Sequence, residues 1–145
     1  MQAQHSSIQR FIDSQETHYS IALKEIRNGR KTSHWIWYVF PQLKGLGRSQ
    51  TSEYYGIQNL DEAREYLNNE LLRSRLIEIS QALLACDGDI QLILGIPDNL
   101  KVRSCMTLFR AVDPSITVFQ EVLDKFYQGK PDYRTLSIIA SQQNQ

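Results

Sequence analysis

Cysteine, glycine and proline are scarce in this 145-residue chain, which has two cysteines, seven glycines and four prolines. Two cysteines cannot supply the disulfide framework of a small secreted domain. Cys86 and Cys105 both stand within apolar helical patterns, where a buried free thiol is the commoner state. No segment is rich enough in glycine, proline or serine to be a linker, and no repeat is visible. We therefore predict one domain over residues 1–145, with its core at about residues 8–140 and frayed ends.

An excess of either charge and a long apolar run are also missing. The sixteen basic and sixteen acidic side chains cancel, so no net field attracts duplex nucleic acid or an anionic membrane. The longest apolar runs, residues 35–40 and 91–96, are far shorter than the ~20 residues of a membrane-spanning helix. The first residues lack the pattern of a secretion signal. We expect a soluble, cytoplasmic protein, and the composition gives no indication of its oligomeric state.

Helical periodicity extends through most of the chain. Apolar residues follow helical spacing from Ile8 to Ile26, where Asn28 and Gly29 end the pattern, and Gln15 is a candidate break within it. Residues 59–62 have the spacing of a capping box. The prediction is an all-α fold, a single compact domain of roughly eight short to medium helices. Beyond the first, the predicted helical segments are 49–56, 59–67, a helix that begins at 71 and ends at Asp87-Gly88, 97–112, 115–127 and 132–141, with a short turn over 90–94.

Residues 33–41 have two interpretations. A cap at Thr32 or Ser33 and the helix-ending Pro41 favour a short helix. The aromatic and β-branched residues of the segment favour a strand. No other part of the chain resembles a partner strand with a hairpin turn, which argues against a lone strand. The sequence leaves helix and strand open.

Residues 33–49 are the most unusual part of the sequence, with both tryptophans, a histidine, two glycines and an arginine. Arg48 and Ser49 follow Gly45-Leu46-Gly47 at a predicted helix start, where backbone N–H groups, the helix dipole and a guanidinium can face one anion. A tight turn with positive φ is the commoner reason for such glycines. The flat faces of Trp35 and Trp37 can stack on a ligand or fill the core.

Two further candidates are His34 and Arg103. Histidine exchanges protons near neutral pH, which makes His34 the sole acid–base candidate; a hydrogen-bonded structural histidine is the alternative. Arg103, if turned inward, needs a carboxylate, carbonyl groups or a bound anion, and a structural salt bridge meets that need equally well. We predict no metal site and no cofactor, because no metal-ligand spacing and no nucleotide or cofactor motif is present.

Two functions fit these residues. The first is a pocket that binds, with or without turnover, a small anionic, phosphorylated or nucleotide-like ligand. The second is a regulatory or protein–protein interaction module that uses exposed aromatic residues as anchors. The sequence leaves open whether the protein is an enzyme. In the first hypothesis the ligand-binding residues are Trp35, Trp37, Gln42, Arg48, Ser49, Arg103 and Ser104, with His34 as the acid–base group.

Residues spread from Ile8 to Leu136 also resemble a known family. The resemblance is carried among others by Arg10-Phe11, Glu25, Gly29-Arg30-Lys31, Ser33-His34-Trp35, Trp37, Phe40-Pro41-Gln42, Gly45-Leu46-Gly47, Tyr54-Tyr55, Asp98, Leu100-Lys101, Arg103-Ser104 and Met106-Thr107-Leu108-Phe109. By these segments the chain resembles the family named domain of unknown function 1810, a set of small bacterial and fungal proteins. The resemblance implies an all-α fold and no established activity, so it assigns no catalytic residue. The label calpastatin, which members sometimes carry, belongs to a disordered, proline-rich inhibitor and does not fit patterned helices.

Overall fold

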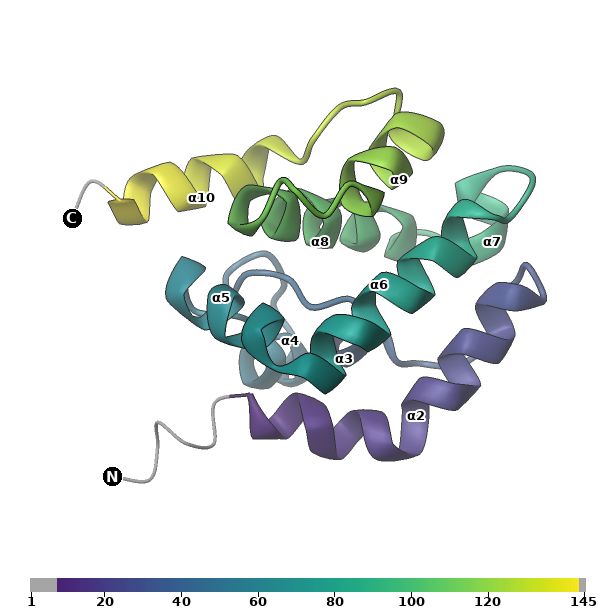
Figure 1. The fold of residues 1–145 in the computed structure, drawn as a ribbon, viewed down its shortest axis with the longest axis horizontal. Helices are drawn as coiled ribbons and strands as arrows, with labels where there is room; N and C mark the ends of the chain where they lie inside the picture. Colours follow the sequence, from purple (N-terminus) through teal and green to yellow (C-terminus); the bar gives the residue numbers. More distant parts are fainter. Residues whose placement is uncertain (1–7, 144–145) are drawn as a thin grey trace.

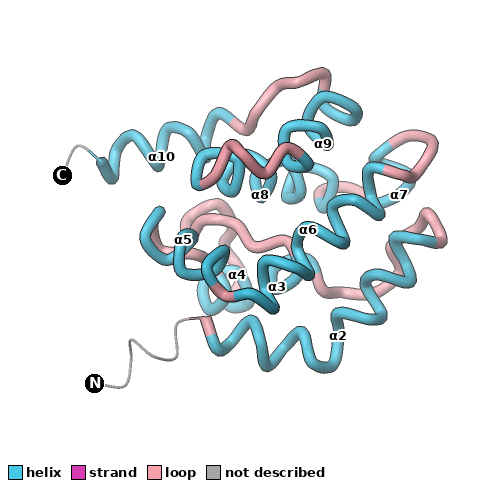
Figure 2. Tube along the Cα trace, in the orientation of Figure 1, coloured by secondary structure: helices cyan, strands magenta, loops and turns pink. Residues whose placement is uncertain are grey.

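The regular structure is entirely helical in the part of the chain that the computed structural model describes, residues 8–143 (Figure 2). The all-α prediction is confirmed, with nine helices in these residues where roughly eight were expected. Of the ends expected to be frayed, residues 1–7 and 144–145 lie outside the described residues, whereas residues 141–143 are not frayed and continue α10. The helices are α2 (Gln9–Arg27), α3 (Ile36–Val39), α4 (Gln50–Tyr55), α5 (Leu60–Asn68), α6 (Glu70–Leu84), α7 (Ile90–Leu94), α8 (Asp98–Val112), α9 (Val118–Tyr127) and α10 (Tyr133–Gln143).

Helix α2 continues through Gln15, so a break at this residue is wrong, although Figure 1 shows that the helix bends along its length. Gln15 is buried, and its Nε2 donates hydrogen bonds to the Tyr38 carbonyl oxygen at 2.7 Å and to the Tyr66 hydroxyl at 3.0 Å. These partners explain a polar residue on the apolar face of the helix, because a buried amide is costly only when it lacks hydrogen bonds. No helix within residues 8–143 is both long and apolar enough to cross a membrane.

The segment that the sequence left open, residues 33–41, contains the one-turn helix α3 and no strand. The backbone N–H of Val39 donates to the Trp35 carbonyl oxygen, and that of Phe40 donates to the Ile36 carbonyl oxygen. Residues on both sides of this turn are buried, including Trp35, Ile36, Trp37, Val39 and Phe40. A half-exposed strand would alternate between buried and exposed side chains, whereas one turn embedded in the core buries neighbours in succession.

Side-chain caps define several helix starts. Asn59 Oδ1 accepts a 2.9 Å hydrogen bond from the backbone N–H of Glu62, which confirms the predicted cap of α5. The Glu62 carboxylate does not complete the predicted box on Asn59, because its Oε1 accepts from the backbone N–H of Gln58 at 2.8 Å. Asn69 caps α6 in the same way as Asn59 caps α5, through a 3.0 Å bond from the N–H of Leu72. Each such cap stabilises a helix by about 1 kcal/mol.

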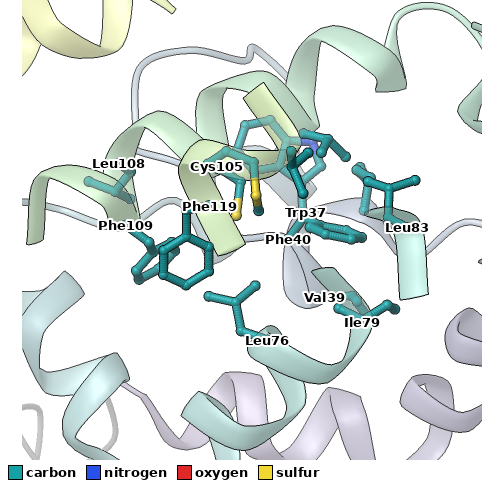
Figure 3. Close-up of a cluster of buried hydrophobic side chains, with 14 of the residues drawn as sticks. Trp37, Val39, Phe40, Leu76, Ile79, Leu83, Cys105, Leu108, Phe109 and Phe119 are labelled. Carbon is teal, nitrogen blue, oxygen red and sulfur yellow. The ribbon is translucent and has the colours of Figure 1, made fainter. Parts of the chain in front are cut away.

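Helix α8 lies at the centre of the packing and contacts α3, α5, α7, α9 and α10, while α6 packs against α2, α5 and α9 (Figure 1). Buried apolar side chains fill the space between these helices (Figure 3). Full burial of one such side chain contributes ~1.5–3 kcal/mol. The labelled part of this core consists of Trp37, Val39 and Phe40 from the α3 segment, Leu76, Ile79 and Leu83 from α6, Cys105, Leu108 and Phe109 from α8, and Phe119 from α9.

A buried ion pair joins α2 to α5, and the same arginine also contacts the end of α4. Arg10 Nη1 lies 2.9 Å from Glu62 Oε2, and the two side chains are 11% and 9% exposed. The same guanidinium donates to the carbonyl oxygens of Tyr54 and Gly56. Since nearly every polar atom of the pair has a partner, the desolvation cost of the two charges is offset and the three segments are held in one arrangement.

Candidate ligand-binding site

A cavity of about 350 Å³ lies beside the tryptophan-rich segment. Two depressions with larger volumes, about 420 Å³ and about 410 Å³, have no aromatic side chain in their lining. The smaller cavity combines aromatic rings with both signs of charge, a composition typical of ligand sites. We call it the tryptophan cavity, and it is lined by Lys31, His34, Trp35, Ile36, Trp37, Tyr38, Ser49, Thr51, Tyr55, Asp98 and Lys101.

Two lysines share one aspartate in the wall of the tryptophan cavity. Lys31 Nζ lies 2.8 Å from Asp98 Oδ2, and Lys101 Nζ lies 3.2 Å from Asp98 Oδ1. Lys31 also donates a 2.5 Å hydrogen bond to the Ser33 carbonyl oxygen. The Lys31 side chain is 6% exposed, whereas that of Lys101 is 28% exposed. Two positive charges against one negative charge leave one ammonium charge without a carboxylate of its own in the lining.

Each of these lysines lies over an indole ring. Lys31 Nζ is 4.9 Å from the centroid of the Trp35 ring, and Lys101 Nζ is 5.8 Å from that of Trp37. Cation–π contacts of this kind contribute ~0.5–2 kcal/mol, more as the ammonium loses its water. Trp35 and Trp37 are only 1% and 6% exposed, so they are core residues that also form the floor of the cavity.

Glu25 holds the loop that carries this wall. Its carboxylate accepts four hydrogen bonds, from the backbone N–H groups of Thr32 and Ser33, the Ser33 hydroxyl and the indole Nε1 of Trp35. Burial alone would raise the pKa of this carboxyl, but the hydrogen bonds from Ser33, Thr32 and Trp35 outweigh it and lower the pKa of Glu25 to about 2. The carboxylate therefore stays charged and positions Trp35 from the side of α2.

Tyr38 and Tyr55 form an aromatic part of the wall. Their ring centroids lie 4.9 Å apart, and both rings line the cavity. The Tyr38 hydroxyl donates to the His34 carbonyl oxygen at 2.8 Å, and the Tyr55 hydroxyl hydrogen-bonds the Ser14 hydroxyl. Burial, helped by the neighbouring Tyr55, raises the pKa of the Tyr38 phenol. The Tyr38 phenol therefore stays neutral, both hydroxyls have hydrogen-bond partners, and the two rings are held in place.

The loop with Gly45 and Gly47 has a structural purpose. Gly45 has φ of 100°, a conformation that L side chains rarely adopt. A Cβ on Gly47 would lie 2.7 Å from Trp37 Cζ2 and 2.7 Å from Ser52 Cβ. The Ser49 hydroxyl, which follows the loop, caps α4 by accepting a 3.0 Å hydrogen bond from the N–H of Ser52. The glycines therefore allow the loop to turn and to pack directly on a tryptophan of the cavity.

Four of the eight residues predicted from the sequence line the tryptophan cavity, namely His34, Trp35, Trp37 and Ser49. Arg48 is exposed and directly precedes Ser49, and no partner holds its guanidinium within residues 8–143. Gln42 is outside the lining and 2% exposed. Its carbonyl oxygen accepts from the N–H of Ile57, and its Nε2 is buried without a hydrogen-bond partner in the described chain.

Arg103 and Ser104 have structural partners away from the cavity. Arg103 Nε donates to the Lys130 carbonyl oxygen at 3.0 Å, and its guanidinium lies 5.8 Å from the Tyr127 ring centroid. Ser104 donates to Asp132 Oδ2 at 3.0 Å. Residues two apart on a helix of 3.6 residues per turn lie roughly 200° apart around its axis, so Lys101 and Arg103 face in different directions. The partners that the sequence led us to expect for the Arg103 guanidinium are therefore the Lys130 carbonyl oxygen and the Tyr127 ring, and no bound anion is required.

Lys31, Asp98, Lys101 and Tyr55 were missed by the reasoning from charge and periodicity. Each is unremarkable alone, because lysine and aspartate usually lie on solvated surfaces. The available signal was their position among the segments that carry the family resemblance. No group of three or more His, Cys, Asp or Glu side chains that could hold a metal ion is found among residues 8–143.

The family model described as "Protein of unknown function (DUF1810)" matches residues 5–139. The chain belongs to this family. The DUF1810 chain is also similar to a conserved hypothetical protein, Rv1873 from Mycobacterium tuberculosis, whose crystal structure superimposes with a TM-score of 0.90 at 42% sequence identity. The match covers 92% of this chain and 96% of the mycobacterial one. A comparison with curated proteins gave no match.

Proposed function

We propose that this protein binds a small anionic ligand in the tryptophan cavity. The observation that carries the proposal is the shared aspartate, because Lys31 and Lys101 together exceed Asp98 by one charge in an aromatic, partly enclosed site. Glu25 lies nearby, but it is not a lining residue and its oxygens are taken up by the loop. An anion that enters the cavity gains a charge-assisted hydrogen bond where little water competes.

Lys101 is the lysine that we expect to hold the ligand. Its ammonium is more exposed than that of Lys31 and lies farther from Asp98, at 3.2 Å against 2.8 Å. Lys31 has the Ser33 carbonyl oxygen as an additional acceptor, so it can keep Asp98 as its partner when the ligand binds. Lys101 exchanges one anionic partner for another, and the buried pair stays intact.

Of the other residues predicted from the sequence, some keep a role in this proposal and others are left out. Arg48 does not line the cavity, but it is exposed and directly precedes the lining residue Ser49, so we keep it as an auxiliary cation; His34, exposed in the lining, is the candidate for proton transfer if the ligand is turned over. Gln42, Arg103 and Ser104 are left out of the ligand set, because none of them lines the cavity. A cytoplasmic location stays a prediction from the sequence.

The alternative, a module that binds partners through an exposed aromatic patch, has less support. Its natural anchors would be Trp35 and Trp37, and these rings are 1% and 6% exposed. The two aromatic side chains most exposed among the described residues, Tyr54 and Tyr133, belong to α4 and α10. The burial of the indoles favours a ligand that enters a cavity over a protein that covers a surface.

The test uses the two tryptophans as reporters. Titration with inorganic phosphate and with small organic phosphates should change the tryptophan emission saturably, since the only indoles of the chain line the cavity. Lys101→Gln should weaken binding about tenfold or more, the value of one charge-assisted hydrogen bond. Lys130→Gln, which removes an exposed lysine outside the lining, is the matched control and should bind as the unmodified protein does. Equal affinities for the two variants would contradict the proposal.

A further inference from the structure

We infer that the ligand of the tryptophan cavity is a nucleoside monophosphate, with its phosphate at Lys101 and its base against Tyr38 and Tyr55. The inference rests on the proposed function and adds the chemical class of the ligand. It follows from four features of the lining, namely its charge, its aromatic wall, its hydroxyl groups and its size.

The charge of the lining suits a single phosphate group. Lys31, Asp98 and Lys101 leave one positive charge, to which the exposed Arg48, the residue before Ser49, adds at most one more. A monophosphate carries one to two negative charges near neutral pH. A di- or triphosphate would bring charges that this wall does not neutralise, and no cluster of acidic side chains in the described chain could hold a metal ion to help.

The aromatic wall suits a planar base. The Tyr38 and Tyr55 rings are half-buried and held by their hydroxyl contacts and by each other, so they lose little conformational freedom when a ring stacks on them. Tyr38 also lies 5.1 Å from the His18 ring and Tyr55 lies 4.8 Å from the Tyr54 ring, centroid to centroid. Stacking on a preformed aromatic surface tolerates different bases, because every base presents a flat π face.

Hydroxyl groups lie in the same lining as the charge and the rings. Ser49 Oγ accepts from the N–H of Ser52, which leaves its own proton for a ligand oxygen. Thr51, exposed and one residue before Ser52, is the second hydroxyl. A ribose between base and phosphate offers the matching oxygens. The volume of about 350 Å³ is at the small end of ligand sites, which favours a mononucleotide over a dinucleotide.

The experiment compares three ligands that differ by one part, each titrated by tryptophan fluorescence and by calorimetry. They are a nucleoside monophosphate, the corresponding nucleoside without the phosphate, and ribose 5-phosphate without the base. The monophosphate should bind on the order of tenfold or more tightly than either fragment, because stacking and the charged hydrogen bond each contribute that much. The four common bases should bind within about tenfold of one another.

The variants locate the two ends of the ligand. Tyr55→Leu should weaken monophosphate binding about tenfold and leave ribose 5-phosphate unchanged, and Tyr55→Phe should restore the stacking. Lys101→Gln should weaken both phosphates. If Tyr55→Leu does not fold, the three-ligand series without any variant still decides the inference.

The outcomes separate the two proposals. Ribose 5-phosphate binding as tightly as the monophosphate overturns the inference about the base and leaves the anion site standing. If a nucleoside binds as tightly as its monophosphate, the phosphate is not held at Lys101 and that part of the inference is overturned. An absence of binding by every phosphate compound overturns both the inference and the proposed function.

Discussion

Gly45 and Gly47 are two residues of one type that the same loop needs for different reasons. Gly45 supplies a backbone conformation, with φ of 100° and open space around the position of a Cβ. Gly47 does not have a positive φ, and its hydrogen atom stands where a Cβ would meet Trp37 and Ser52 at 2.7 Å. At the residue scale, Gly45 therefore allows the loop to turn, and Gly47 allows it to contact Trp37 closely.

Gly47→Ala should lower the free energy of unfolding by ~1–3 kcal/mol, because its new methyl group overpacks the site. Gly45→Ala should lower it by ~1–2 kcal/mol, because the backbone conformation is strained for an L residue. Only Gly47→Ala should alter the tryptophan emission of the folded protein, because only its new methyl group reaches the Trp37 ring. Urea unfolding followed by circular dichroism, with native emission spectra of both variants, checks the pair. The same shift in both variants would show that the contact with Trp37 is not the cause.

At the scale of elements, the segment after α2 is attached to that helix through one side chain. Glu25, in the last turns of α2, accepts hydrogen bonds from Thr32, Ser33 and Trp35 across a turn of the chain. Lys31 adds a second attachment, since its backbone N–H donates to the Ile93 carbonyl oxygen in α7 at 2.7 Å. The short helix α3 is thereby placed by its neighbours, since a single turn has little stability of its own.

Glu25→Gln should make the melting temperature of the protein less dependent on pH in acid. The pKa of Glu25 in the folded protein, about 2, is below its ordinary value of 4.5, so its charge stabilises the fold fully above pH 4.5 and the stabilisation disappears as the pH falls toward 2. The melting temperatures of the variant and the unmodified protein should therefore differ most near neutral pH and converge within this window.

Thermal unfolding at a series of pH values measures this effect. Glu53→Gln, which changes a carboxylate whose side chain is 58% exposed, serves as the control and should follow the unmodified protein throughout. A difference between Glu25→Gln and the unmodified protein that stays constant down to pH 2 would contradict the assigned ionisation of Glu25.

At the scale of the whole molecule, the two cysteines report on the packing between helices. Cys105 is fully buried in α8, and burial raises the pKa of its thiol well above the ordinary value. Cys86 is half-buried, and its thiol donates to the Ile26 carbonyl oxygen at 3.1 Å. Burial and the neighbouring Asp87 raise the pKa of Cys86, while Lys125 lowers it. Neither thiol is in the reactive thiolate form.

A thiol reagent should therefore modify Cys86 slowly in the folded protein and Cys105 only when the helices separate. The rate for Cys105 should follow global unfolding and rise with denaturant, and both thiols should react at once in concentrated guanidinium chloride. Cys86→Ser leaves Cys105 as the only thiol and isolates its rate. Modification of Cys105 at the rate of an exposed thiol would show that the α8 core opens locally.

The fold was largely predictable because helix formation depends on neighbours three and four residues apart. The periodic segments appeared as helices at the expected places, although α9 begins three residues later than predicted and the turn expected over residues 90–94 is the short helix α7. Residues 33–41 were not predictable, because a one-turn helix has no periodicity and its apolar side chains are buried against α2, α4 and α8. Gln15 was misleading for a related reason, since its partners Tyr38 and Tyr66 are far away in the sequence.

The sequence by itself determined the all-α class and the capped start of α5, since composition and local spacing encode these features. The tertiary structure alone decided which charges far apart in the sequence meet. Asp98 and Lys101 are brought to Lys31 and the two indoles because α8 begins beside the loop that follows α2. It also turned Arg103 toward Lys130 and Tyr127. Ion pairs between distant residues depend on how helices pack, and side-chain spacing along the chain carries no record of that.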